Sequence, residues 1–154
     1  MDGFSKYKKT LLAFGIALTT LSFILVLNKT LEDVPYDQVS LWIDNEKVLV
    51  LELVNTPESR QLGLSGRELL ELGSGMLFFF DMSDKHGIWM KDMNFAIDIV
   101  WIDENYKIVD IKKNARPESF PEVFVPKTSS KYVLEVNTGF LEKNDIEIGE
   151  RIFF

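Results

Sequence analysis

The sequence predicts a mainly β domain, compact and antiparallel, barrel- or sandwich-like, with a short helical insert and one N-terminal transmembrane helix before it. Three observations lead to this fold class. Residues 11–27 contain no charge, and the rest of the chain holds many short β-like runs between polar turns. Only one segment, beginning at Thr56, carries clear helix-start signals. Many short strands with little helix are typical of sandwiches and barrels.

The charge-free run predicts a signal anchor. Its 17 residues would span about 25 Å as a helix, near the lower limit for crossing a hydrocarbon core. Lys6, Lys8 and Lys9 precede it and acidic residues follow it, so the positive-inside rule places the N-terminus in the cytoplasm. A cleaved signal peptide, which would need small residues at a cleavage site, and a buried globular helix are the alternatives.

This topology divides the chain into four parts. We expect a cytoplasmic N-terminus at 1–10, a transmembrane signal anchor at 11–28, a tether at 29–38 and an extracytoplasmic β-rich domain at 39–154. The protein would then lie in the cell membrane as a single-pass protein, with the membrane itself as one partner.

Composition limits the partners of the domain. From Leu31 onward the chain has 13 basic and 23 acidic side chains, a net charge of −10, in a length suited to one core. Such a domain would repel a phosphate backbone, so we expect no nucleic-acid partner. With no cysteine and one histidine, His86, we expect no metal and no cofactor.

The first elements of the domain are a hairpin and a helix. Residues 39–43 and 47–54 are β-like runs separated by a polar turn, and the second is apolar on both faces, as expected inside a sheet. Thr56, Pro57 and Glu58 predict a helix start, and Gly63 ends that helix. A second helical turn is expected at 67–72.

The remaining elements are strands and loops. Residues 76–80 predict a strand followed by a polar loop at 81–87. Residues 97–102 and 106–112 flank a three-residue polar tip and predict a hairpin. We expect a further strand at 132–137, after a proline-marked loop, and a C-terminal segment at 151–154 that closes the sheet.

Four sequence blocks in series carry a family resemblance. They are Gly63-Leu64-Ser65-Gly66-Arg67-Glu68-Leu69, Gly75-Met76-Leu77-Phe78, Trp89-Met90-Lys91 with Asp98 following, and Leu134-Glu135-Val136-Asn137-Thr138-Gly139. Together they resemble the bacterial and archaeal family known as domain of unknown function 192, DUF192. The resemblance covers roughly residues 48–152.

The resemblance implies a compact β-rich fold with a short helical insert, often behind an export signal. It implies no reaction. The chain departs from the family pattern where Asp92-Met93 replaces Asn-Thr, and where Ala96 precedes Ile97-Asp98 in place of proline. A ligand contact made by that amide and hydroxyl would be altered here.

The candidate ligand-binding residues are Arg67, Trp89, Lys91, Asp98 and Glu135. In a polar pocket Arg67 and Lys91 would bind an anionic group, with Asp98 or Glu135 as acceptor or base. Trp89 would line the pocket or stack on Arg67. The alternative is that the charged residues form buried ion pairs that join the helical insert to the sheet.

Three functions stay open from the sequence. The first is non-catalytic binding of a small ligand or a protein partner, because the chain has no motif that marks a nucleophile. The second is an envelope hydrolase or lyase that uses Asp98 or Glu135 with Lys91. The third is a structural envelope component.

Overall fold

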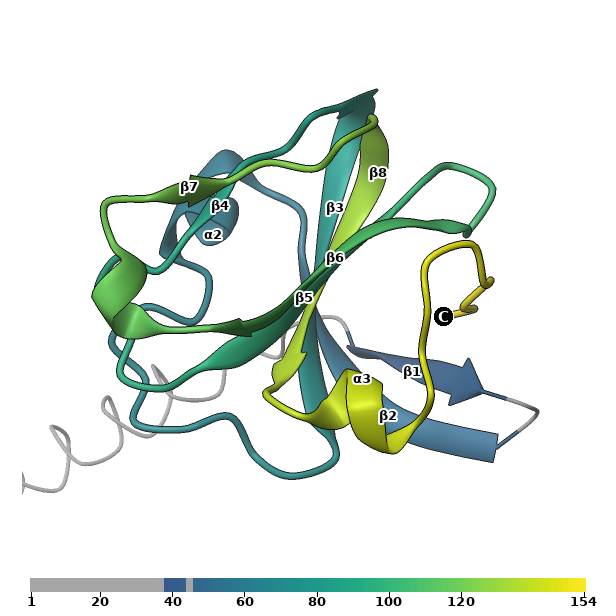
Figure 1. Cartoon of the computed structure of the whole chain (residues 1–154), viewed down its shortest axis with the longest axis horizontal. Coiled ribbons are helices and arrows are strands. Elements are labelled where there is room, and N and C mark those ends of the chain that lie inside the picture. The colour runs from purple at the N-terminus through teal and green to yellow at the C-terminus, as the bar shows by residue number, and fades with distance from the viewer. Residues whose placement is uncertain (1–37, 44–45) are drawn as a thin grey trace, which may run out of the picture. The chain divides into compact units, whose positions relative to one another are not determined.

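The computed structural model describes residues 38–43 and 46–154. Within them, a six-stranded sheet has the order β1-β2-β3-β8-β5-β6, and β4 and β7 form a separate pair (Figure 1). The elements are β1 (Gln38–Ile43), β2 (Glu46–Val54), α2 (Pro57–Leu62), β3 (Ser74–Asp84), β4 (Ile88–Trp89), β5 (Ile97–Ile102), β6 (Ile108–Ala115), a 3-10 turn (Pro117–Ser119), β7 (Val123–Phe124), β8 (Ser130–Asn137) and α3 (Phe140–Lys143). The predicted mainly β class with short helices is confirmed.

The predicted cytoplasmic N-terminus at 1–10 lies outside the described residues. The anchor at 11–28, and the tether as far as residue 37, also lie outside them. In residues 38–43 and 46–154, no helix combines the length and apolar character needed to cross a membrane.

Helix α2 begins as the sequence predicts. The Thr56 hydroxyl accepts a hydrogen bond from the Ser59 N–H, and the Ser59 hydroxyl accepts one from the Thr56 N–H, both at 3.1 Å. This reciprocal capping box satisfies two backbone donors, and Pro57 needs none at the first helical position. Gly63 has φ of 51° and ends the helix, where a side chain would be strained.

The expected helical turn at 67–72 does not form. The side-chain amide of Asn137, at the end of β8, donates to the carbonyl groups of Leu70 at 3.1 Å and Glu71 at 3.3 Å. These carbonyl groups are therefore bonded to the sheet, and the buried Leu70 side chain holds the loop against it.

The sheet is mixed, which corrects the antiparallel expectation. β2 and β3 are parallel, with Glu52 opposite Met76, while the other four neighbouring pairs in the sheet are antiparallel. Helix α2 lies between β2 and β3 in the chain and returns it to the starting end of β2, the connection that a parallel pair requires. β3 also extends to Asp84, through most of the loop expected at 81–87.

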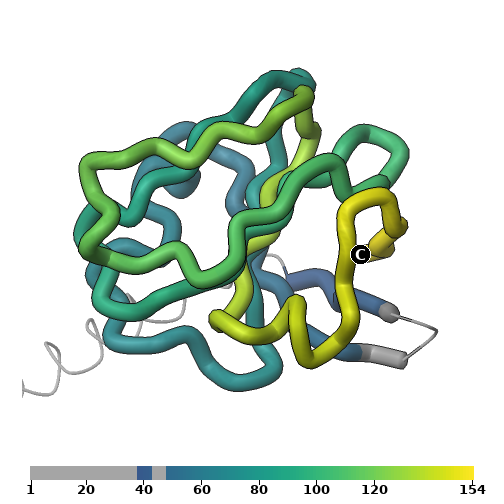
Figure 2. Tube along the Cα trace, viewed as in Figure 1, coloured from purple at the N-terminus to yellow at the C-terminus, as the bar shows by residue number. Residues whose placement is uncertain are grey.

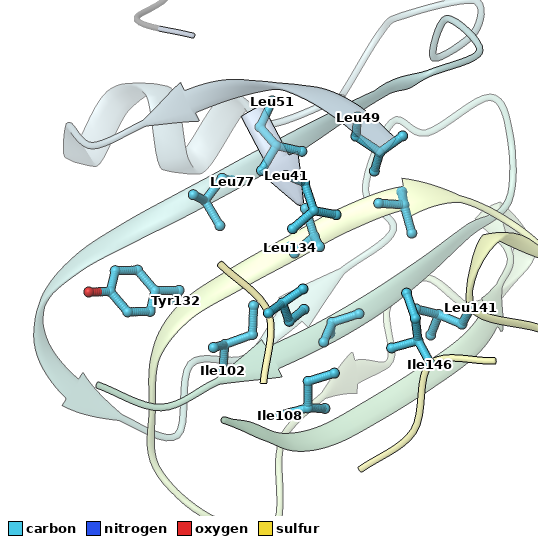
Figure 3. Close-up of a cluster of buried hydrophobic side chains, with 13 residues drawn as sticks. Leu41, Leu49, Leu51, Leu77, Ile102, Ile108, Tyr132, Leu134, Leu141 and Ile146 are labelled. Atoms are coloured by element: carbon cyan, nitrogen blue, oxygen red, sulfur yellow. The ribbon is translucent and has the colours of Figure 1, made fainter. Parts of the chain in front are cut away.

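The two faces of the sheet bury two hydrophobic clusters. Figure 3 shows the first cluster, which packs against α3 and the C-terminal segment. In Figure 1, α2 and the β4–β7 pair lie on one side of the long strands, and α3 and the C-terminus on the other. The first cluster is Leu41, Leu49, Leu51, Leu77, Val100, Ile102, Ile108, Tyr132, Leu134, Val136, Leu141, Ile146 and Ile152. The second is Val54, Leu64, Leu70, Met76, Phe78, Ile88, Met90, Ile97, Ile99, Trp101, Ala115, Phe124 and Val133.

The C-terminal segment joins the two edges of the sheet, as the sequence predicted. Trp42 in β1 forms a bridge with Phe153, and Lys107 beside β6 forms one with Arg151. The Trp42 N–H donates to the Phe153 carbonyl at 3.1 Å. In Figure 2 this segment passes between β1 and the hairpin that leads into β6.

Candidate functional site

Glu135 lies at the centre of the sheet, on the face of the second cluster. In register it is opposite Met76 of β3 and Ile99 of β5, and Met76 is opposite Glu52 of β2. Its neighbours Leu134 and Val136 belong to the first cluster, so strand alternation turns Glu135 the other way. One buried carboxyl is therefore surrounded by an apolar face.

The environment of this carboxyl favours the neutral acid. Glu135 is 5% exposed, and burial raises its pKa to about 8, although the charge of Arg67 lowers it in part. Water no longer stabilises the anion there, and the attraction of one guanidinium offsets only part of the loss. At pH 7 the acid would outnumber the anion by about ten to one.

Arg67 forms an ion pair with Glu52. Its two terminal nitrogens donate to the two carboxylate oxygens of Glu52 at 2.8 and 2.7 Å. Bidentate pairing is the strongest geometry available to arginine. The pair connects the loop after α2 to β2, and the charge of Arg67 also acts on Glu135.

A pocket of about 230 Å³ opens beside Glu135. Its walls come from α2 and the turn after it, from β3 and from β4. The lining is mostly apolar, with Glu135 and Arg60 as its ionisable members. It consists of Arg60, Gln61, Leu62, Gly63, Leu64, Ser65, Phe78, Phe80, Gly87, Ile88, Trp89, Met93 and Glu135. The pocket is smaller than the roughly 300–1,000 Å³ of drug-sized sites, so it suits a compact group.

Arg60 and Phe80 form the edge of this pocket. The Arg60 guanidinium donates to the carbonyl groups of Asn55 and Phe79, both at 2.8 Å, and lies 3.9 Å from the Asp81 carboxylate. It also sits 5.3 Å from the centre of the Phe80 ring. These contacts fix Arg60 against the strand.

His86 stacks on the Phe80 ring as well. The ring centroids are 3.5 Å apart, with 8° between the planes. Its Nε2 lies 3.0 Å from the Met82 carbonyl oxygen, so the imidazole is held in place from the outside of the pocket. His86 is not one of the lining residues.

Three hydrogen bonds between two loops hold the turn that follows α2. The Ser65 hydroxyl donates to the Lys91 carbonyl, and the Gly66 N–H donates to the Asp92 carbonyl, both at 2.8 Å. The Asn94 side chain donates to the Arg67 carbonyl at 2.8 Å. Lys91 takes part through its backbone, while its side chain is exposed and outside the pocket lining.

Asp98 lies on the opposite face of the sheet from Glu135. Ile97 and Ile99 on either side of it belong to the second cluster, so Asp98 faces the first. One of its oxygens accepts from the Asn114 N–H at 2.9 Å and the Thr138 hydroxyl at 3.4 Å. The other accepts from the N–H groups of Gly139 at 3.0 Å and Leu141 at 3.3 Å. This carboxylate orders the turn into α3.

The structure therefore brings together only part of the predicted set. Trp89 and Glu135 line one pocket, and Arg67 acts on Glu135 through its charge. Lys91 and Asp98 lie elsewhere. Among the described residues no group of three or more His, Cys, Asp or Glu side chains is placed to hold a metal ion.

Sequence reasoning missed Glu52 and the aromatic rings of Phe78 and Phe80, which form a ring wall in the pocket. Glu52 lies in register with Met76, and alternation along β2 places it on the same face as Val50 and Val54, which could have flagged it. Phe78 and Phe80 alternate with Leu77 and Phe79 in β3, so both had to share a face with Met76 and hence with Glu135.

Two other hollows are wider. One, of about 360 Å³, lies between the start of β2 and the turn before α3, and one of about 410 Å³ lies beside the end of β6. Neither is lined by a buried ionisable side chain. The pocket beside Glu135 is therefore the strongest candidate site in the part of the chain described.

The fold and the pocket define a mainly β domain with a buried acid at the wall of a small cavity. The chain belongs to the DUF192 family, whose model, described as Uncharacterized ACR, COG1430, matches residues 39–154. The predicted family resemblance is confirmed.

Curated relatives have the same uncharacterised status. A UPF0127 protein of Pyrococcus furiosus is 33% identical over 67 residues, which cover 44% of this chain and 52% of the relative. A UPF0127 protein of Thermococcus sibiricus is 37% identical over 57 residues, which cover 37% of this chain and 34% of the relative. The chain thus spans about half, or less, of the length of the curated relatives it matches.

Two solved structures are similar in fold. A crystal structure from Sinorhizobium meliloti 1021, provisionally described as a transcription regulator, has a TM-score of 0.70 at 29% identity and covers 79% of this chain and 96% of its own. A protein of unknown function from Novosphingobium aromaticivorans has a TM-score of 0.68 at 24% identity and covers 76% of this chain and 84% of its own. The second likeness concerns the fold alone.

Proposed function

We propose that this domain binds a small molecule in the pocket beside Glu135 and does not transform it. The observation that supports this most directly is a carboxyl group that is buried, yet placed in the wall of a cavity. Burying an ionisable group costs stability unless it is fully paired. A binding role would explain why a buried carboxyl is present, because binding pockets orient their ligands through a few polar groups in apolar walls.

The other charged candidates favour binding over catalysis. Arg67 is engaged with Glu52, and all four hydrogen bonds of Asp98 hold the turn into α3. Glu135 thus has no second acid or base of the predicted set beside it in the pocket. The ligand contacts we now propose are Glu135, Trp89 and the ring wall, in place of an anion site at Arg67 and Lys91.

A thermal-shift screen of the full-length chain tests this proposal. Compounds that raise the melting temperature would be retested on Trp89→Ala and Glu135→Gln, with Trp42→Ala as the matched control. The control is suitable because Trp42 is 46% exposed and Trp89 45%, while Trp42 lies outside the pocket. A ligand present at 100 times its Kd raises the free energy of unfolding by about 2.7 kcal/mol. Both pocket variants should lose the shift, and hits that act equally on all variants would refute the site.

Proton transfer is the second candidate function. The pKa of Glu135, raised by burial to about 8, lies near neutral, where general acids and bases work best. A hydrolase or lyase would then use Glu135 rather than Asp98. Turnover that Glu135→Gln abolishes while ligand binding persists would favour this alternative.

The transcription-regulator description of the Sinorhizobium relative is not extended to this chain. The domain of this chain has 23 acidic and 13 basic side chains from residue 31 onward, and it would repel a phosphate backbone.

We also propose that residues 11–28 anchor the chain in the cell membrane with residues 39–154 outside. The support is the charge-free run after three lysines. Protease added to intact spheroplasts should digest the C-terminal domain. A domain that resists the protease until the cells are lysed would refute this topology.

A further inference from the structure

The pocket has the composition of a cation site. We infer that its ligand is a compact organic cation, an alkylated ammonium group held between aromatic rings and the Glu135 carboxylate. The inference rests on the proposed binding function and specifies the chemistry of its ligand. Three rings, Phe78, Phe80 and Trp89, and the thioether of Met93 share one lining with a single acidic group.

The ring wall attracts positive charge. The face of an aromatic ring is negative, and an ammonium group within about 6 Å of its centre is held electrostatically. Phe80 already makes a cation–π contact, because the Arg60 guanidinium lies 5.3 Å from the centre of its ring. Its ring also stacks on His86, so we place the ligand against Phe78 and Trp89, the other two rings of the lining. Trp89, at 45% exposed, can close over a ligand from the rim.

Glu135 supplies the counter-charge. A neutral ligand leaves the buried carboxyl as an acid, whereas a cation at contact distance stabilises the anion and lowers its pKa. The carboxyl then releases its proton to solvent as the cation binds, and the pair has no net charge. The cost of burying each charge is offset by the other, which a neutral or anionic ligand cannot provide.

The basic groups around the pocket do not reserve it for an anion. The Arg67 guanidinium already donates two hydrogen bonds to the Glu52 carboxylate. Arg60 is held by two carbonyl groups, with Asp81 at 3.9 Å. Lys112 of β6 is in register with Ile99 of β5, and its ammonium group lies 4.6 Å from the centre of the Phe124 ring. An anion would meet a buried acid, and both arginines already donate to protein acceptors.

The charge of the domain acts in the same direction. With a net charge of −10 from residue 31 onward, the domain raises the local concentration of cations. Small size also matters, since about 230 Å³ suits a trimethylammonium group better than a drug-sized molecule.

Three probes of the same shape test the inference. They are choline, its neutral isostere 3,3-dimethylbutan-1-ol, and the anion 3,3-dimethylbutanoate, titrated calorimetrically into the full-length chain in non-ionic detergent. At pH 9 choline should bind at least tenfold more tightly than the alcohol. Its affinity should fall about tenfold per pH unit from pH 8 to 6, with one proton released per choline bound near pH 7.

Two variants complete the test. Glu135→Gln should remove both the preference for choline and its pH dependence, while Glu122→Gln, the same change on an exposed side chain, should keep them. If the alcohol or the carboxylate binds as tightly as choline at every pH, and Trp89→Ala weakens that binding, the cation inference fails while the ligand pocket stands. If no probe binds, the cation inference fails, and the compound screen alone decides whether the pocket binds anything.

Discussion

Replacing Glu135 with glutamine should make the domain more stable, by an amount that grows with pH. Glutamine keeps the shape and hydrogen-bonding capacity of the neutral acid but cannot ionise. In the wild type, burial raises the pKa of Glu135 from 4.5 to about 8. Below pH 4.5 the carboxyl is protonated in both the folded and the unfolded chain, so ionisation costs nothing.

The magnitude follows from the two pKa values. Between pH 4.5 and 8 the unfolded chain releases a proton that the folded chain holds, and the free energy of unfolding falls by about 1.4 kcal/mol per pH unit. Over these 3.5 units the loss is on the order of 5 kcal/mol, and above pH 8 it stays constant. This is a large part of the roughly 5–15 kcal/mol that holds a domain together.

Urea denaturation at five pH values between 5 and 9 would measure this difference. The quantity of interest is the free energy of unfolding of Glu135→Gln minus that of wild type, which should rise by about 4 kcal/mol from pH 5 to 8 and then level off. Glu122→Gln, on an exposed side chain, should give a flat line. A flat line for Glu135→Gln too would mean that Glu135 is ionised in the folded protein at neutral pH, and the argument for a buried acid would be wrong.

Three further changes test other parts of the structure. Asp98→Asn should destabilise the domain by about 2–3 kcal/mol, because an amide nitrogen would face backbone N–H groups that now donate to a carboxylate; unchanged urea midpoints would contradict this. Arg67→Met combined with Glu52→Gln should raise the pKa of Glu135 above 8, since it removes the charge that lowers it, and an NMR titration of the Glu135 carboxyl that moved downward would contradict the assignment. Ile152→Ala should cost about 2–4 kcal/mol, because Ile152 is 3% exposed in the first cluster, and a cost below 1 kcal/mol would mean that the C-terminal segment is not part of the core.

Local signals predicted the six strands of the main sheet and the helix start, but not the short pair β4–β7. The capping residues around Thr56 and the polar tip at 103–105 are each decided within a few residues. The Asp103 carboxylate, for example, accepts from the N–H groups of Asn105 and Lys107 at 2.8 and 2.9 Å. Such features depend on neighbours in the chain, so sequence reasoning reaches them.

Contacts between distant segments escaped prediction. The parallel pairing of β2 with β3 follows from where α2 takes the chain, and the loss of the expected turn at 67–72 follows from bonds to Asn137, more than sixty residues later. The candidate site also depends on contacts between segments that are distant in the sequence. Its walls come from α2, β3, β4 and β8, and nothing near Glu135 in the sequence announces Arg60 or Phe80.

Asp98 and Glu135 show why a charged residue in an apolar strand does not by itself identify a site. Both are almost fully buried, at 1% and 5% exposed, and both sit among aliphatic neighbours in adjacent strands. Asp98 meets four donors, three of them backbone N–H groups, because its face of the sheet packs against the turn before α3. Glu135 faces the other way, where α2 and β4 leave a cavity and Arg67 already binds Glu52. Which carboxyl is structural and which is available to a ligand is thus decided by what covers each face. The sequence shows the alternation of faces, but only the packed elements show which face is left open.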